Sequence, residues 1–260
     1  MPKQAWQPFT PRGIAAFAHS SATRLLLAQI VVAASVAMAL IWFLSVAWFP
    51  VVTDAIRALP ATGEIRGGTL NWNGPGRTRL AENPRLAFVV DFDRTTNSGH
   101  VSDVEVTFEK GQATACTAWR CWHRPYERGH VFSFNRPALE PAWGARRGPL
   151  LALVAALTML SVYVMWWALA FVYAPLVKLI AFFADRVVTW GGAWRLSAAG
   201  LLPGAMLVAL ALVLYGFDAV DLPRFVLLYT LHIAAGLLFV VTGTLFLPKV
   251  SEKKAGNPFT

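Results

Sequence analysis

The chain has 260 residues, of which 56% are hydrophobic and only 14% are charged, and its mean hydropathy is +0.50. Soluble domains carry roughly 25% charged residues, so this composition excludes a disordered chain and argues against a soluble single-core enzyme. The net charge of +9 is spread thinly along the chain, which argues against nucleic-acid binding and is explained by contacts between basic ends and anionic lipid head groups.

Four stretches are long and apolar enough to cross a hydrocarbon core about 30 Å thick, which takes about 20 helical residues. None of them contains Asp, Glu, Lys or Arg. The predicted transmembrane helices are 25–49, 149–173, 197–215 and 225–247. The first is too long for the apolar core of a signal peptide and lacks a small-x-small cleavage pattern, so we expect a retained anchor.

The connecting segments predict the orientation of these helices, because basic side chains near helix ends are retained in the cytoplasm. The segments rich in Lys and Arg are 1–24, 174–196 and 248–260. The short loop 216–224 instead contains Asp218 and Asp221 against one arginine. We therefore expect a multi-pass protein of the bacterial inner membrane with both termini in the cytoplasm and residues 50–148 outside it.

Two of the cytoplasmic segments are predicted to lie along the membrane surface. Pro175 is expected to bend the helix that begins at 149, because proline removes a backbone donor and disfavours helical geometry before it. Residues 174–196 then form an interfacial segment, with a re-entrant segment as the alternative. Similarly, residues 9–24 are a candidate interfacial helix that bears Ile14 and Phe17.

The segment 50–148 changes from a helical to an extended pattern and predicts an antiparallel β-rich domain of four or five strands. Val104 to Phe108 alternates apolar and polar residues, which is typical of a half-buried strand. The following Gly111 predicts a hairpin turn into the next strand. The other candidate strands are 69–73, 86–92 and 131–134, with a turn at 96–99. Residues 136–148 are expected to return the chain to the second transmembrane helix.

The chain contains two cysteines, Cys116 and Cys121, and both lie in the predicted external domain. An even cysteine count in an oxidising compartment favours one disulfide that closes a tight loop. Free thiols are one alternative. A zinc site is another, since His123 and His130 would complete two sulfur and two nitrogen ligands, although the spacing matches no standard zinc motif. We expect no cofactor.

Aromatic and arginine side chains are concentrated beside the second cysteine. These residue types dominate the energetic hot spots of protein interfaces. The candidate contact surface comprises Trp119, Arg120, Trp122, His123, Arg124, Tyr126 and Arg128. The alternative is a small core of aromatic side chains stacked against the disulfide and the lipid surface.

A second candidate site lies in the apolar helices. His232 is the one titratable residue well inside a predicted span, and a polar residue there is a candidate functional group. The favoured alternative is a neutral imidazole bonded to a neighbouring helix. Small residues that allow close helix approach accompany it. They are Gly236 and Gly243 in the fourth span, and Gly200 and Gly204 in the third.

Several short motifs after the first span resemble a family of bacterial integral membrane proteins of unknown function, some encoded beside maltodextrin-utilisation genes. The motifs are Ala58-Leu59-Pro60, Gly67-Gly68-Thr69-Leu70, Asn83-Pro84 and Val89-Val90-Asp91. The resemblance covers roughly residues 10–110, although Thr69 departs from the family pattern and the segment 116–126 has no counterpart. It implies an anchor, an exported sheet domain and a C-terminal group of spans, and no activity.

From these features we predict an accessory, sensing or assembly subunit that binds a protein partner through its external domain and is embedded in the lipid bilayer. The alternative is a small permease component or a lipid-handling membrane enzyme whose function resides in the helices. The absence of charged residues from the four spans argues against ion-coupled transport. Oligomeric state does not follow from the sequence.

Overall fold

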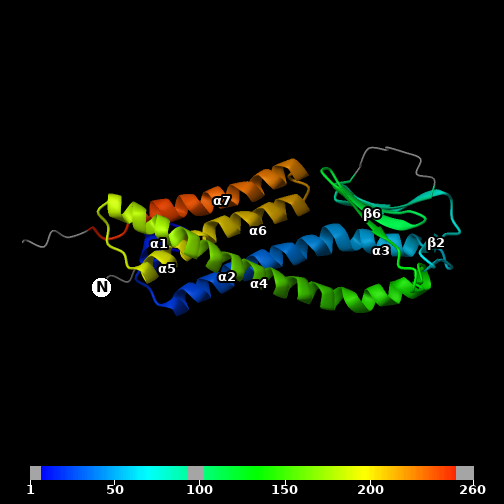
Figure 1. Ribbon diagram of the computed structural model, residues 1–260, viewed down its shortest axis with the longest axis horizontal. Coiled ribbons are helices and arrows are strands. Elements are labelled where there is room, and N and C mark those ends of the chain that lie inside the picture. Colours follow the sequence, from blue (N-terminus) through cyan, green and yellow to red (C-terminus); the bar gives the residue numbers. More distant parts are fainter. Residues whose placement is uncertain (1–6, 93–101, 250–260) are drawn as a thin grey trace, which may run out of the picture. The chain divides into compact units, whose positions relative to one another are not determined.

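The computed structural model describes residues 7–92 and 102–249 and is mostly helical, with a small region of β-sheet (Figure 1). The chain divides into two compact units. The helical unit comprises Met1–Leu40 and Val154–Thr260, and the sheet unit comprises Ile41–Leu153. The predicted turn at 96–99 and the ends of the predicted tails lie outside the described residues.

The helical unit is built from helices with clear sequence signals at their first residues. Its helices are α1 (Pro11–Phe17), α2 (Ala22–Phe43), α5 (Trp190–Gly200), α6 (Leu202–Gly216), α7 (Leu222–Leu245) and the later part of α4 (Arg136–Phe183). Thr10, Thr189 and Asp221 each precede a helix and accept a hydrogen bond from the backbone N–H three residues later. This N-terminal capping satisfies donors that a helix cannot pair internally.

Four helical stretches are long and apolar enough to cross a membrane, which confirms the number expected from the sequence. They are Ala22–Ala58, Arg136–Phe183, Trp190–Gly216 and Leu222–Leu245. The first joins α2, a π-helical turn η1 (Leu44–Trp48) and α3 (Phe49–Ala58). The third joins α5 and α6 with a break at Leu201, just before the proline in the first turn of α6.

The largest departure from the predicted boundaries is in α4, which has 48 residues and is helical through both Pro149 and Pro175. The expected return segment 136–148 is therefore helix, and the expected interfacial segment 174–196 consists of the end of α4, a connection and the start of α5. Beyond Pro175, Val177 and Ala181 are 0% and 2% exposed in the core of the helical unit. Their burial offsets the backbone hydrogen bond that proline removes.

The candidate interfacial helix at the N-terminus is also different from the expectation. It is interrupted at residues 18–21, and only α1 and the start of α2 are helical. Ile14 and Phe17 are 0% and 3% exposed because α1 packs against α5 and α7. Their apolar side chains thus belong to the core of the helical unit.

Three segments meet at one end of the helical unit. Arg195 donates to the carbonyl oxygen of Ala18 at 3.0 Å, and Arg186 donates to that of Leu247 at 2.6 Å. The backbone N–H of Val187 donates to the carbonyl oxygen of Pro248 at 2.9 Å. The junction between α1 and α2, the connection from α4 to α5 and the residues after α7 are therefore neighbours.

The sheet unit contains a two-stranded and a five-stranded sheet. The first pairs β1 (Glu64–Arg66) with β2 (Thr69–Asn71) through a turn in which Gly67 and Gly68 both have positive φ. The second has the order β3 (Arg77–Glu82), β4 (Leu86–Asp91), β5 (Val104–Phe108), β6 (Gln112–Thr117), β7 (Cys121–Pro125). Glycine suits the turn because it adopts positive φ without a Cβ penalty.

The prediction of an antiparallel sheet is wrong for one pair of strands, because β4 and β5 are parallel and the five-stranded sheet is mixed. The predicted hairpin around Gly111 is confirmed by the antiparallel pairing of β5 and β6. The predicted strand at 131–134 is reduced to one bridge between Phe132 and Ile65. Strand β7 is an element that the sequence did not predict.

The core of the sheet unit lies between the strands and helix α3. Ala55 and Leu59 of the α3 region pack with apolar residues from both sheets and from the segment before α4. These are Ile65, Leu70, Leu80, Val90 and Phe134. Figure 1 shows the strands beside α3, and the motif residues Leu59, Leu70 and Val90 are therefore core positions.

Candidate functional sites

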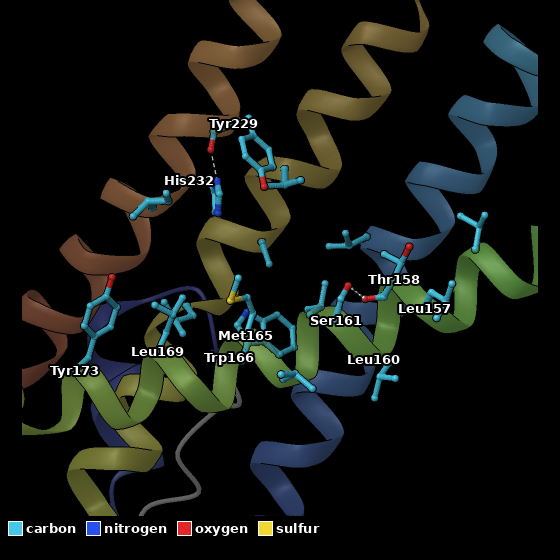
Figure 2. A pocket seen from close by; sticks show the side chains of 18 residues that line it. Leu157, Thr158, Leu160, Ser161, Met165, Trp166, Leu169, Tyr173, Tyr229 and His232 are labelled. Carbon is cyan, nitrogen blue, oxygen red and sulfur yellow. Dashed lines mark hydrogen bonds between the residues drawn. The ribbon is translucent and has the colours of Figure 1, made fainter. Parts of the chain in front are cut away.

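A cavity of about 920 Å³ lies among α2, α4, α6 and α7 in the helical unit (Figure 2). This volume is near the upper end of the range for small-molecule sites, about 300–1,000 Å³. None of the described lining residues is Asp, Glu, Lys or Arg. Two of the lining side chains, Leu160 and Met165, are each 61% exposed, so the cavity opens at the surface of the unit.

A few polar side chains interrupt the apolar lining. They are Thr158, Ser161, Tyr173, Tyr229 and His232. The Ser161 hydroxyl donates to the carbonyl oxygen of Thr158 at 2.9 Å, which leaves its oxygen able to accept. A large apolar cavity with a small number of hydrogen-bonding groups is the usual form of a ligand site.

His232 presents a hydrogen-bond acceptor to this cavity. Its Nδ1 contacts the carbonyl oxygen of Tyr229, one turn earlier in the same helix. Because a carbonyl oxygen only accepts, Nδ1 carries the hydrogen in this contact, which leaves Nε2 as the acceptor when one ring nitrogen is protonated. Figure 2 shows the imidazole extending from α7 into the space above α4. The partner of Nδ1 thus belongs to α7 itself, and a bond from the ring to a neighbouring helix remains a prediction.

The glycines predicted to allow close helix approach do lie at helix contacts. A Cβ on Gly204 would overlap the backbone carbonyl oxygen of His232, and one on Gly200 would lie 2.5 Å from Cγ2 of Val240. A Cβ on Gly236 would lie 3.2 Å from a methyl group of Leu201. Gly243 faces Ile14 of α1, with a corresponding distance of 3.0 Å.

Gln29 of α2 is a buried polar residue that the sequence reading missed. It is 0% exposed, and neither its amide oxygen nor its amide nitrogen has a hydrogen-bond partner within the described residues. The signal was available, because Gln29 is the one amide side chain in the four apolar helices. Burial of an unpaired amide is costly, so Gln29 is a candidate for a role other than packing.

We expect Gln29→Leu to raise the stability of the helical unit, because leucine fills a similar volume without burying unpaired polar atoms. The gain is roughly 1–3 kcal/mol, the cost of an unsatisfied buried group. Thermal unfolding of the purified protein in detergent measures it. Ser35→Ala is the control on the same helix, since Ser35 is half-buried and its hydroxyl bonds within α2, to the carbonyl oxygen of Val31. A lower melting temperature for Gln29→Leu would mean that the amide has a stabilising partner.

The predicted disulfide is present between Cys116 and Cys121, which are opposite each other at the ends of β6 and β7. The zinc alternative is therefore wrong for these two sulfur atoms. No group of three or more His, Cys, Asp or Glu residues within 7–92 and 102–249 is placed to hold a metal ion.

The seven residues of the candidate contact surface do not form one continuous surface in the structure. Trp119 and Trp122 are 67% and 51% exposed, and the Arg120 guanidinium lies 5.8 Å from the centre of the Trp122 ring. Arg124 is exposed beside Glu127 at 3.8 Å. The two tryptophans are therefore not buried by the protein itself, and the expected stacking against the lipid surface remains a prediction.

The remaining residues of the predicted surface lie elsewhere. His123 is on the other face of β7, where Nδ1 lies 3.0 Å from the Thr114 hydroxyl, and Arg128 lies beside Gly68 of the first hairpin. Tyr126 packs against the core of the sheet unit, and its hydroxyl is buried. Burial, and to a lesser extent Glu109, raise the pKa of Tyr126, so its phenol is neutral at physiological pH.

Asn83 is a second residue whose importance appears only in the fold. Its side-chain oxygen accepts from the backbone N–H groups of Arg85 and Leu86 at 2.9 and 2.8 Å. Its amide nitrogen donates to the carbonyl oxygen of Ala47 in the π-helical turn at 2.6 Å. A π turn displaces carbonyl groups from the regular helical pattern, and Asn83 thus links this turn to the start of β4.

Comparison with known proteins finds no matching family model, curated protein or solved structure. The function must therefore be inferred from the geometry of the chain itself.

Proposed function

We propose that this chain is an integral membrane protein whose helical unit binds an uncharged, lipid-like molecule in the cavity among α2, α4, α6 and α7. The observation that carries the proposal is the cavity of about 920 Å³ with an apolar lining and hydroxyl and imidazole groups on two sides. In a membrane-spanning bundle its exposed edge faces lipid, so a ligand enters from the bilayer.

The chemistry of the lining selects the class of ligand. Without a lysine or arginine among the described lining residues, the cavity offers no partner for a phosphate or carboxylate group. It does offer the hydroxyl groups of Thr158 and Tyr229 and the Nε2 acceptor of His232. These groups suit a long apolar molecule with one hydroxyl or carbonyl group, because the two hydroxyl groups can donate or accept a hydrogen bond and Nε2 can accept one.

We further propose that both termini are cytoplasmic and that the sheet unit faces the opposite compartment. The three basic segments of the chain support this orientation, since they meet at one end of the helical unit through Arg195 and Arg186. The loop that contains Asp218 and Asp221 connects the other ends of α6 and α7. Basic residues on the cytoplasmic side agree with the general charge asymmetry of membrane proteins.

The experiment is identification of the lipids that accompany the protein through purification in a mild detergent, by native mass spectrometry and lipid extraction. We expect an uncharged lipid-like species enriched over its share of the membrane. Ser161→Trp, which places a large side chain in the cavity, is expected to reduce its retention about tenfold, equivalent to about 1.4 kcal/mol of binding free energy.

The matched control is Ala156→Trp, which adds the same side chain at an exposed position of α4 outside the cavity. We expect this variant to retain the molecule as the wild type does, with both variants monodisperse and equally heat-stable. Recovery of bulk phospholipids alone, in the same amount from all three proteins, would contradict the proposal. The role of an accessory subunit with a protein partner, expected from the sequence, remains a prediction.

A further inference from the structure

Phe49, Trp143 and Arg147 form a cluster in the sheet unit that is typical of side chains at a membrane–water boundary. The ring of Phe49 packs edge to face with Trp143 at 4.9 Å between centres, and the Arg147 guanidinium lies 5.5 Å from the centre of the Phe49 ring. Immediately after Arg147, α4 becomes apolar from Pro149 onward. Tryptophan and arginine with aromatic neighbours are typical of the interfacial layer of a membrane. We therefore take Phe49 of α3 and residues 143–147 of α4 as the level of the membrane–water boundary.

The register of the sheet brings one of its ends to the same level. Asn83 lies in the turn between β3 and β4, and its side chain bonds to Ala47, which is two residues before Phe49. Leu86 at the start of β4 pairs with Val104, and Val104 pairs with Thr117. The turn between β6 and β7 follows Thr117. It therefore lies at the same end of the sheet as Asn83, which bonds to Ala47 in the apolar turn η1. The turn at Gly111 lies at the opposite end.

The side chains on this turn have the chemistry of an interfacial anchor. Trp119 is 67% exposed, and Arg120 stacks on the half-exposed Trp122. Within residues 7–92 and 102–249, Arg120 forms no ion pair with an acidic side chain. An exposed indole and a stacked guanidinium bind well where apolar chains meet anionic head groups.

The turn is also held in one conformation before any contact is made. The disulfide joins Cys116 to Cys121 on either side of it. The Thr117 backbone N–H donates to the carbonyl oxygen of Arg120 at 2.8 Å, and the Thr117 hydroxyl donates to the same oxygen at 3.2 Å. A rigid turn loses little conformational entropy on binding.

We propose that this turn, Thr117–Cys121, is a membrane-surface site that binds the head groups of anionic phospholipids with Trp119 and Arg120. The inference rests on the membrane-spanning helices of the proposed function and adds a second lipid site, of opposite chemistry to the uncharged cavity. The position of the turn favours lipid over a protein partner, because its level is that of Phe49, Trp143 and Arg147.

The test uses the full-length protein in nanodiscs, with an environment-sensitive fluorescent amino acid in place of exposed Ala118, beside intact Trp119 and Arg120. The quencher is phospholipid brominated high on its acyl chains. A probe at exposed Lys110, in the opposite turn of the sheet, is the control. A probe at Phe171, which is 66% exposed on α4, reports whether the helices are in the bilayer.

We expect quenching at positions 118 and 171 and none at 110. Quenching at 118 should rise about twofold or more when phosphatidylglycerol is added to phosphatidylcholine and should fall with salt, which screens surface charge. Arg120→Gln should abolish the dependence on phosphatidylglycerol without changing the signal at 171.

Three results would overturn the inference. Quenching at 171 with none at 118 would do so while leaving the membrane-spanning helices in place. Equal quenching at 118 and 110 would show that the turn is no closer to the lipid than the opposite end of the sheet. Equal quenching with and without phosphatidylglycerol would show that anionic head groups are not what the turn binds. Loss of quenching at 171 would instead contradict the proposed function itself. Crosslinking of position 118 to a protein, with no quenching, would identify a protein contact.

Discussion

Replacement of Gly204 by alanine is expected to destabilise the helical unit by forcing α6 and α7 apart. The added Cβ would overlap the backbone carbonyl oxygen of His232 on α7. A backbone oxygen cannot rotate away as a side chain can, so α6 and α7 must separate. The cost is about 3 kcal/mol, at the upper end of the range for an overpacked core.

Thermal unfolding in detergent measures this effect, and we expect the melting temperature to fall by roughly 6–12 °C. Gly144→Ala and Gly148→Ala are the controls, since a Cβ at either position of α4 meets nothing within 4 Å. Alanine in an open helical position should be neutral or stabilising by up to about 1 kcal/mol. A Gly204→Ala protein as stable as these controls would show that α6 and α7 are farther apart than in this structure.

The same variant links packing to the proposed ligand site. His232 lines the cavity through its ring and contacts Gly204 through its carbonyl group. A displacement of α7 from α6 therefore moves His232 relative to Ser161 and Thr158 on α4. We expect Gly204→Ala to retain less of the lipid-like molecule than the wild type at a temperature where both proteins are folded.

Continuous apolar runs made the four apolar helices predictable, because length and composition alone specify a helix that avoids water. The disulfide was predictable because Cys116 and Cys121 have no competing cysteine partner. The contacts between helices at the glycines were predictable because a residue without a side chain lets two helix backbones approach closely. The cavity itself was not predictable, since it depends on the angles between helices, which single-sequence patterns do not contain.

The elements that sequence reasoning missed depend on contacts between distant residues. Helix α4 passes through Pro175 because Val177 beyond it is buried in the core. Strand β7 has no alternation of apolar residues, and it forms because it pairs with β6 next to the disulfide. The parallel pairing of β4 was signalled by its nearly continuous apolar sequence, which is typical of a strand buried on both faces.

Replacement of Asn83 is expected to have the largest effect in the sheet unit, because one side chain satisfies three backbone groups. Asn83→Ala removes the acceptor for the N–H groups of Arg85 and Leu86 and the donor for the carbonyl oxygen of Ala47. Each part-buried group left unpaired costs about 1–3 kcal/mol, so we expect a loss of about 3 kcal/mol or more. Asn73→Ala is the control, since exposed Asn73 makes one bond, to the Thr62 hydroxyl.

Asn83→Asp separates the two functions of this side chain. Aspartate keeps an oxygen for the N–H groups of Arg85 and Leu86 but presents an acceptor to the carbonyl oxygen of Ala47, which repels it. Hydrogen exchange of the full-length protein should therefore show faster exchange of Arg85 and Leu86 in Asn83→Ala alone, and faster exchange around the π-helical turn in both variants. Unchanged exchange in this turn would mean that the bond to Ala47 does not hold the sheet to the helix.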